Sequence, residues 1–178
     1  MTAFHVAGLL REPPGAVREH RLRDRYLSLA PDVELAGPVS GLIRMQRTNR
    51  GILVRGTLSA ELRRTCGRCL EPYVEAATIE VSEEFLPSID PDSGATLPGP
   101  DRDEAVRAID EHHELDLTPV FREEFALTEP MHPLCRPDCA GLCTDCGEPL
   151  GPGHAAHAND EIDPRLAGLA RFLDRDRN

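Results

Sequence analysis

The sequence predicts an α+β fold, with an antiparallel β-sheet meander as its core, followed by short helices and a C-terminal cysteine-rich zinc-knuckle loop. Three observations predict this fold. Apolar and polar residues alternate through residues 33–86, Thr118 and Pro119 form a helix start, and six cysteines lie in closely spaced groups. The 178 residues suffice for a buried core, which we expect to be aliphatic because only 4% of the residues are aromatic.

The first segment, residues 1–30, is predicted to contain an N-terminal strand and an Arg-rich stretch. An apolar run from Phe4 to Leu10 precedes a Pro-Pro-Gly turn, and four arginines follow it: Arg18, Arg21, Arg23 and Arg25. The apolar run has no basic leader and is far shorter than the roughly 20 apolar residues that span a bilayer. We therefore expect a cytoplasmic protein with no membrane partner.

Residues 31–86 are predicted to form the antiparallel β core. Apolar residues alternate with polar ones from Val39 to Met45, a turn follows at Asn49-Arg50-Gly51, and the alternation resumes from Ile52 to Leu62. In that second strand one face carries Val54, Leu58, Ala60 and Leu62. A third alternating stretch, from Tyr73 to Leu86, completes a meander of at least three strands.

The remaining chain is predicted to divide into an acidic linker and a helical, cysteine-rich end. Residues 87–113 are rich in Pro, Gly and Asp, as in a flexible loop. In residues 114–178 a short helix begins near Pro119, with Thr118 as its N-cap, and Pro130 and Pro133 end it. After the cysteine-rich loop, a last helix is predicted from Pro164, with Leu166, Leu169, Ala170 and Leu173 on one side.

The cysteine spacing predicts a structural zinc ion. Cys66 and Cys69, and likewise Cys143 and Cys146, have the two-residue separation at which one tight turn presents two thiolates to a tetrahedral metal. In the cytosol thiols stay reduced, which favours metal binding over disulfides. We expect the two pairs to share one ion. The alternative combines Cys143 and Cys146 with the nearby Cys135 and Cys139.

Other interpretations of these residues are weaker. The Cys66 pair could be two small buried residues at a strand end, and a redox-active dithiol would need a helix after the motif, where a turn and a strand follow instead. His154 and His157 are expected to lie in a solvated Gly-rich linker, and His132 on the polar surface.

The charge distribution predicts a basic surface on an acidic protein. The net charge is −11, yet residues 1–70 contain 12 Arg against 6 acidic residues, whereas residues 71–178 contain 8 Arg against 25. Seven arginines lie on or between the central strands and the first cysteine turn: Arg44, Arg47, Arg50, Arg55, Arg63, Arg64 and Arg68. Guanidinium groups bind phosphate bidentately, so we expect this set to bind RNA. Alternatively, these arginines form ion pairs with the acidic half of the chain.

Several motifs, in order, resemble the YceD family of large ribosomal RNA subunit accumulation proteins. They are the stretch from Cys66 to Pro72, the acidic loop, Leu115 to Val120, Pro133 to Gly147, and Ile162 to Arg165. The resemblance covers about residues 33–173. It implies a non-enzymatic bacterial or plastid factor that supports the synthesis, processing or stability of large-subunit ribosomal RNA.

The expected partner is therefore large-subunit ribosomal RNA or a pre-ribosomal particle, with no small-molecule substrate. Two alternatives stay open. In one, the acidic half binds a basic ribosomal protein and the chain makes no direct RNA contact. In the other, the cysteines form a redox sensor that releases zinc when they are oxidised.

Overall fold

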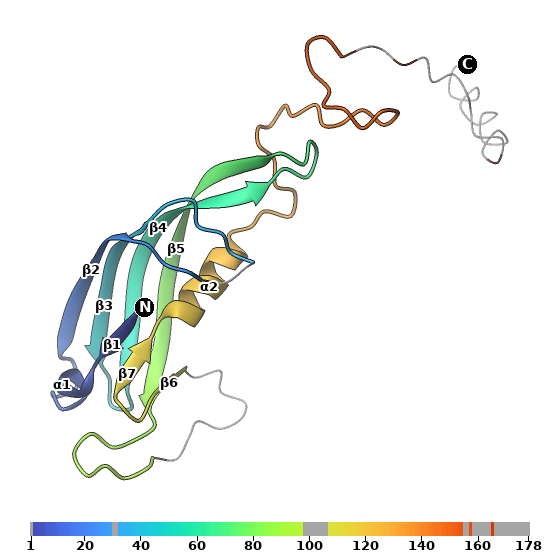
Figure 1. Cartoon of the computed structure of the whole chain (residues 1–178). Helices are drawn as coiled ribbons and strands as arrows, with labels where there is room; N and C mark the ends of the chain where they lie inside the picture. Colours follow the sequence, from blue (N-terminus) through green and yellow to red (C-terminus); the bar gives the residue numbers. More distant parts are fainter. Residues whose placement is uncertain (1, 30–31, 98–106, 155–156, 158–164, 166–178) are drawn as a thin grey trace, which may run out of the picture.

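The computed structural model describes residues 2–29, 32–97, 107–154, 157 and 165 (Figure 1). A five-stranded sheet in the order β2-β3-β4-β5-β6 dominates it, accompanied by a two-stranded β1-β7 sheet and two short helices. In chain order the elements are β1 (Ala3–His5), α1 (Ala7–Leu10), β2 (Val17–Arg25), β3 (Val39–Arg47), β4 (Ile52–Thr65), β5 (Pro72–Pro87), β6 (Arg107–Ile109), β7 (Glu114–Asp116) and α2 (Thr118–Leu127).

The predicted meander is confirmed. Strands β2 to β5 pair antiparallel in sequence order, because a short turn joins β3 to β4 and the Cys66 turn joins β4 to β5. Strands β4 and β5 have 14 and 16 residues, whereas β2 and β3 have 9 each. The β4–β5 hairpin therefore extends beyond the rest of the sheet and carries the first cysteine pair at its tip (Figure 1).

Three short elements differ from the prediction. Residues 17–25, expected only as an Arg-rich stretch, form an edge strand of the main sheet. Part of the apolar run near the N-terminus turns into helix α1. The predicted linker ends in β6, which pairs parallel to β5 through Phe85 and Arg107, so this segment extends the sheet.

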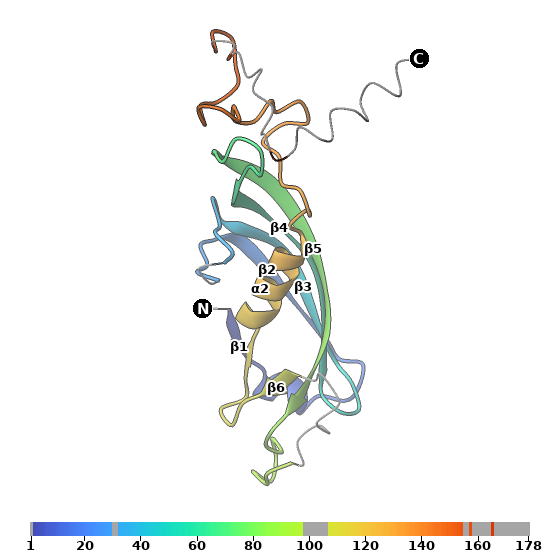
Figure 2. The same cartoon turned by 90° about the vertical axis from the view of Figure 1, so that its right-hand side faces the viewer.

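The curved sheet has one covered face and one open face. Figure 2 shows α2 and the short strand β1 on the concave side of the sheet, whereas no described element lies on its convex side. Alternate residues of β3 and β4 point to the covered side, where Ile43, Val54 and Leu58 are completely buried. The faces predicted for β3 and β4 are confirmed.

Phenylalanine contributes more to the core than its low frequency suggests. Phe85 of β5 and Phe121 and Phe125 of α2 are at most 1% exposed and are the largest fully buried side chains of the described residues. They lie among aliphatic residues from every strand of the main sheet, from β7 and from α1. The apolar stripe of α2 is thus the main cover of the sheet.

Helix α2 starts where the sequence predicts, but by a different mechanism. Leu117 occupies the N-cap position and no side chain caps the helix, while Pro119 falls in the first turn. The Thr118 hydroxyl instead lies 2.5 Å from that of Thr2 and bonds to Asp116, which joins the helix start to the β1-β7 pair. The helix predicted from Pro164 lies outside the described residues. Among the described residues, no helix is both long and apolar enough to cross a membrane.

Candidate metal centres and nucleic-acid interface

The two Cys-x2-Cys turns have the same backbone conformation. Cys66 N–H donates to the Glu71 carbonyl at 3.0 Å, and Leu70 N–H donates back to the Cys66 carbonyl at 2.9 Å. In the second turn, Cys143 N–H donates to the carbonyl of Glu148 at 2.8 Å, and Gly147 N–H donates to the Cys143 carbonyl at 3.0 Å. We call these turns knuckle 1 (residues 66–71) and knuckle 2 (residues 143–148).

Each knuckle requires a left-handed residue four positions after its first cysteine. Gly147 supplies it in knuckle 2 with φ 74°, at no steric cost. Leu70 adopts φ 61° in knuckle 1, a conformation that is costly for a residue with a branched side chain. A tight turn that directs two sulfur atoms to one side is the arrangement that metal-binding cysteine pairs use.

Knuckle 1 is completed by Cys135 and Cys139 from the loop after α2. The Sγ atoms of Cys66 and Cys139 are 3.8 Å apart, as are those of Cys69 and Cys135. A disulfide would need a separation of about 2.0 Å. Four thiolates about 2.3 Å from one tetrahedral zinc ion have a mutual separation of about 3.8 Å. All four sulfur atoms lie within 4.8 Å of one another, so this four-cysteine site could hold a metal ion.

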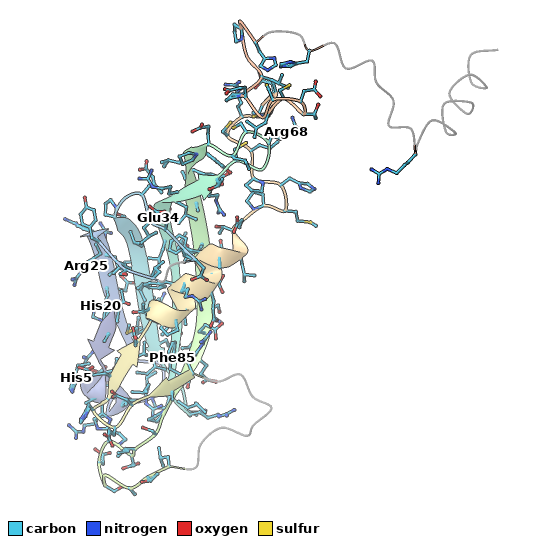
Figure 3. The ribbon with its side chains drawn as sticks, turned by 45° about the vertical axis from the view of Figure 1, so that its right-hand side comes forward. His5, His20, Arg25, Glu34, Arg68 and Phe85 are labelled. Carbon is cyan, nitrogen blue, oxygen red and sulfur yellow. The ribbon has the colours of Figure 1, made fainter. Side chains whose placement is uncertain are left out.

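Backbone contacts bring the second half of the four-cysteine site to the hairpin tip. Gly67 N–H donates to the Pro133 carbonyl at 2.8 Å, and the Arg68 guanidinium donates to the Cys139 carbonyl at 2.9 Å. Figure 3 shows sulfur atoms gathered next to Arg68 at the tip of the β4–β5 hairpin. Cys66 and Cys139 are buried there, at 0% and 3% exposure.

The pKa values of two thiols in this site, Cys66 and Cys135, are shifted in opposite directions. The backbone N–H groups of Cys69 and Cys135 lower the pKa of Cys66 to about 6, because they stabilise its thiolate. Burial and the neighbouring cysteine side chains raise the pKa of Cys135 to about 12. Of these two thiols, Cys66 therefore ionises far more readily than Cys135.

Knuckle 2 is completed by two histidines. The ligand atoms of Cys143, Cys146, His154 and His157 lie within 4.8 Å of one another. The distance from Cys146 Sγ to His154 Nε2 is 3.2 Å, and the two imidazole rings are 5.2 Å apart in an edge-on arrangement. The backbone N–H groups of Cys146 and Asp145 lower the pKa of Cys143. We call these four residues the Cys2His2 group; they too could hold a metal ion.

The structure thus differs from the expected pairing of the cysteines. The expected set joined Cys66 and Cys69 to Cys143 and Cys146, but each pair lies in a separate group. The alternative set, Cys135 and Cys139 with Cys143 and Cys146, does not come together either. Sequence reasoning also assigned His154 and His157 to a linker. Their three-residue separation, so soon after a Cys-x2-Cys turn, was the signal for their position.

Several predicted RNA-binding arginines have structural contacts. Arg47 donates to the carbonyls of Leu10, Thr48 and Gly51. Arg64 is 8% exposed, forms an ion pair with Glu75 at 2.9 Å and donates to Thr128 at 2.8 Å. These bonds hold α1 and the end of α2 against the sheet.

The other predicted arginines lie on exposed positions. Arg68 is the arginine bound to the Cys139 carbonyl, Arg63 forms an exposed ion pair with Glu34 at 2.9 Å, and Arg50 occupies the β3–β4 turn. Arg44 and Arg55 are directly opposite each other on β3 and β4, on the open face. Within the described residues, no ion pair engages Arg44 or Arg55.

A shallow groove crosses the open face at this arginine pair. Its lining includes Leu42, Thr57 and Ser82 besides the two arginines. The acidic residues Glu19 and Glu80 also line it, and Glu19 is the cross-strand partner of Arg44 on β2, so charges of both signs are present. Arg44 and Arg55, which we call the arginine pair, bring two like charges side by side at the centre of the sheet.

Comparisons with known proteins provide a family assignment. No solved structure matches the chain. Uncharacterized proteins from Mycobacterium bovis and Mycobacterium tuberculosis are each 37% identical over 131 residues, which cover 74% of this chain and 60% of the relative. An uncharacterized protein from Mycobacterium leprae is 29% identical over 143 residues, 79% of this chain and 62% of the relative. The chain thus spans about 60% of the length of these curated relatives.

The family match covers both knuckles and the part of the sheet from Val54 onward, but not β2 and β3. It extends over residues 54–173, which is more than half of the chain, and includes β4 from Val54 onward, β5, α2 and all six cysteines. The matched family is described as large ribosomal RNA subunit accumulation protein YceD. The resemblance seen in the sequence is therefore confirmed, and the chain belongs to the YceD family.

Proposed function

We propose that this chain is a non-enzymatic cytoplasmic factor that supports the synthesis, processing or stability of large-subunit ribosomal RNA. It binds RNA or pre-ribosomal particles on the open face of its sheet, and zinc in the four-cysteine site holds its C-terminal loop in place. The family description links such proteins to accumulation of the large ribosomal subunit RNA.

The observation that carries the RNA-binding proposal is the arginine pair. Like charges directly opposite each other in an antiparallel sheet are destabilising, yet Arg44 and Arg55 have no carboxylate between them in the described residues. A phosphate group placed between two guanidinium groups would remove this repulsion and accept hydrogen bonds from both. The pair is therefore suited to a phosphodiester backbone.

The surroundings of the arginine pair favour contacts with the sugar–phosphate backbone over contacts with bases. The open face next to the pair carries hydroxyl side chains, such as Ser59 and Thr78, whose oxygens are 3.0 Å apart. The described residues that line the groove include no aromatic side chain. We therefore do not expect bases to stack on this surface. Hydroxyl groups and guanidinium groups can bind phosphates and the 2′-hydroxyls of RNA.

The zinc proposal rests on the geometry of the four-cysteine site. The Cys66–Cys139 and Cys69–Cys135 sulfur separations of 3.8 Å equal the edge of a zinc–thiolate tetrahedron. Binding of a structural zinc ion contributes on the order of 10 kcal/mol, which would fix the loop after α2 to the β4–β5 tip. The metal would position the loop, and no catalytic step is assigned to it.

The test is binding of the purified full chain to fragments of large-subunit ribosomal RNA at increasing salt. We expect affinity that falls steeply as salt rises, since phosphate contacts release counterions. If the chain binds no fragment at any salt concentration but binds a basic ribosomal protein, the direct RNA-binding proposal is wrong and the acidic adaptor replaces it.

A further inference from the structure

The Cys2His2 group lies in a part of the chain that has almost no apolar packing. Residues 144–153 are all exposed, and the segment is rich in Gly and Pro. Nevertheless, it has a defined turn. Leu142 pairs with Pro149, and Leu150 N–H donates to the Gly141 carbonyl at 2.9 Å. A segment this short, with no core of its own, usually needs a metal or disulfide to stay folded.

The position of the two histidines follows from the turn that precedes them. His154 N–H donates to the Gly151 carbonyl at 3.1 Å, and Gly153 has φ 100°, which bends the chain back toward knuckle 2. As a result His154 Nε2 approaches Cys146 Sγ to 3.2 Å. A zinc ion bound by one thiolate and one imidazole separates these atoms by about 3.6 Å, so a small outward shift would admit the ion.

We propose that Cys143, Cys146, His154 and His157 bind a second zinc ion, independently of the four-cysteine site. Two thiolates and two neutral imidazoles are a ligand set that zinc prefers. The two groups share no ligand, and knuckle 2 has the hydrogen bonds of knuckle 1. Each knuckle thus supplies two ligands of its own site. Cys135 and Cys139 supply the other two for knuckle 1, and His154 and His157 supply them for knuckle 2.

The two sites differ in exposure, which makes them separable. Cys66 and Cys139 are buried in the four-cysteine site, whereas Cys146 is exposed. A chelator should therefore reach the second ion first. Because residues 144–153 do not pack on the sheet, loss of this ion should unfold knuckle 2 and leave the β core intact.

The experiment measures zinc per chain in the reduced, zinc-reconstituted full-length protein. We expect two equivalents in the unaltered chain and one in the double variant H154A/H157A, with the melting temperature of the sheet almost unchanged. The variant H154C/H157C should retain two equivalents because cysteine can replace histidine as a ligand. The matched control is His132→Ala, which removes an exposed histidine outside both groups and should retain two.

Cobalt substitution and release kinetics give a second readout. Cobalt in a site with two sulfur ligands has weaker thiolate charge-transfer absorption than cobalt in a site with four. The cobalt absorption that is lost in H154A/H157A should therefore be the weaker of the two thiolate charge-transfer components. In the zinc-loaded variant, the faster phase of zinc release to a chelator should also be lost. If H154A/H157A keeps the full metal content and the fast phase, the second site does not exist.

The same measurements distinguish this inference from the zinc proposal above. The variant C135S/C139S removes two ligands of the four-cysteine site only, and it should lose the slowly released ion. If this variant keeps the metal content of the unaltered chain while H154A/H157A loses one equivalent, the four-cysteine proposal fails and the second site stands.

Discussion

Cys66 and Cys139 are 73 residues apart in sequence, yet their sulfur atoms are 3.8 Å apart. One cysteine lies at the tip of the β4–β5 hairpin and the other in the loop after α2. The contact therefore joins the end of the sheet to a segment that has little apolar packing of its own. We expect the stability of this end of the molecule to depend on metal.

Replacement of Cys139 by serine should lower the zinc content by one equivalent and destabilise the protein. Loss of a structural metal ranks among the largest single-site effects, above about 4 kcal/mol in the free energy of unfolding. Zinc analysis and urea denaturation measure both quantities. Thr144→Ala, an exposed change between the cysteines of knuckle 2, is the control and should alter neither. Unchanged metal content in C139S would show that Cys139 is not a ligand.

Gly51→Ala should destabilise the sheet. A Cβ atom at this buried position would lie 2.0 Å from the Phe85 carbonyl oxygen in the neighbouring strand, and backbone cannot move aside without disrupting the β4–β5 pairing. We expect a loss of about 1–3 kcal/mol, as in other overpacked sites. Gly151→Ala, which meets nothing within 4 Å, should stay within about 0.5 kcal/mol of the unaltered chain in thermal denaturation. Equal melting temperatures for the two variants would contradict the predicted clash between a Cβ atom at position 51 and the Phe85 carbonyl oxygen.

The ion pair between Asp32 and Arg122 predicts a specific pH dependence. Hydrogen bonds from the Arg122 guanidinium hold the pKa of Asp32 below its usual range. Because the folded-state pKa is lowered, the pair stabilises the fold above the unfolded-state pKa of about 3.9 and loses this effect as pH falls through the folded-state value.

Urea denaturation of the unaltered chain and of Arg122→Gln checks this dependence. The difference in stability between them should be constant above about pH 5 and shrink below about pH 4. If the difference in stability is the same at pH 3 and pH 7, ionisation of Asp32 does not contribute to the stability that the ion pair provides.

The central strands could be predicted from sequence because their apolar residues alternate strictly, whereas β2 could not. Val17–Arg25 contains few apolar residues, and Leu22 is the only one of its described side chains that is buried in the core. On the covered face of this edge strand His20 packs against Phe4, with ring centroids 4.9 Å apart. A strand whose own residues are mostly polar carries no clear period-two signal.

The metal ligands could be predicted only in part for a similar physical reason. The Cys-x2-Cys spacing specifies a local turn, and both predicted turns are present. Which residues complete knuckle 1 depends on how the loop after α2 docks on the hairpin, through contacts such as Gly67 to Pro133, whereas the histidines reach knuckle 2 through their own local turn. Likewise, the alternation in the sequence implies that Arg44 and Arg55 lie on the face opposite the core residues, but it does not show that Arg47 binds backbone carbonyls.

The most direct test of the account is the salt dependence of RNA binding by the double variant R44Q/R55Q. Large-subunit ribosomal RNA fragments are titrated with the unaltered chain, with this variant, and with R11Q/R122Q. The last removes the same charge from two exposed arginines that form ion pairs with Asp92 and Asp32. The account predicts weaker binding by R44Q/R55Q and a salt slope lower by about 1–2, with little change in the control. Equal affinities and slopes for all three proteins would contradict it.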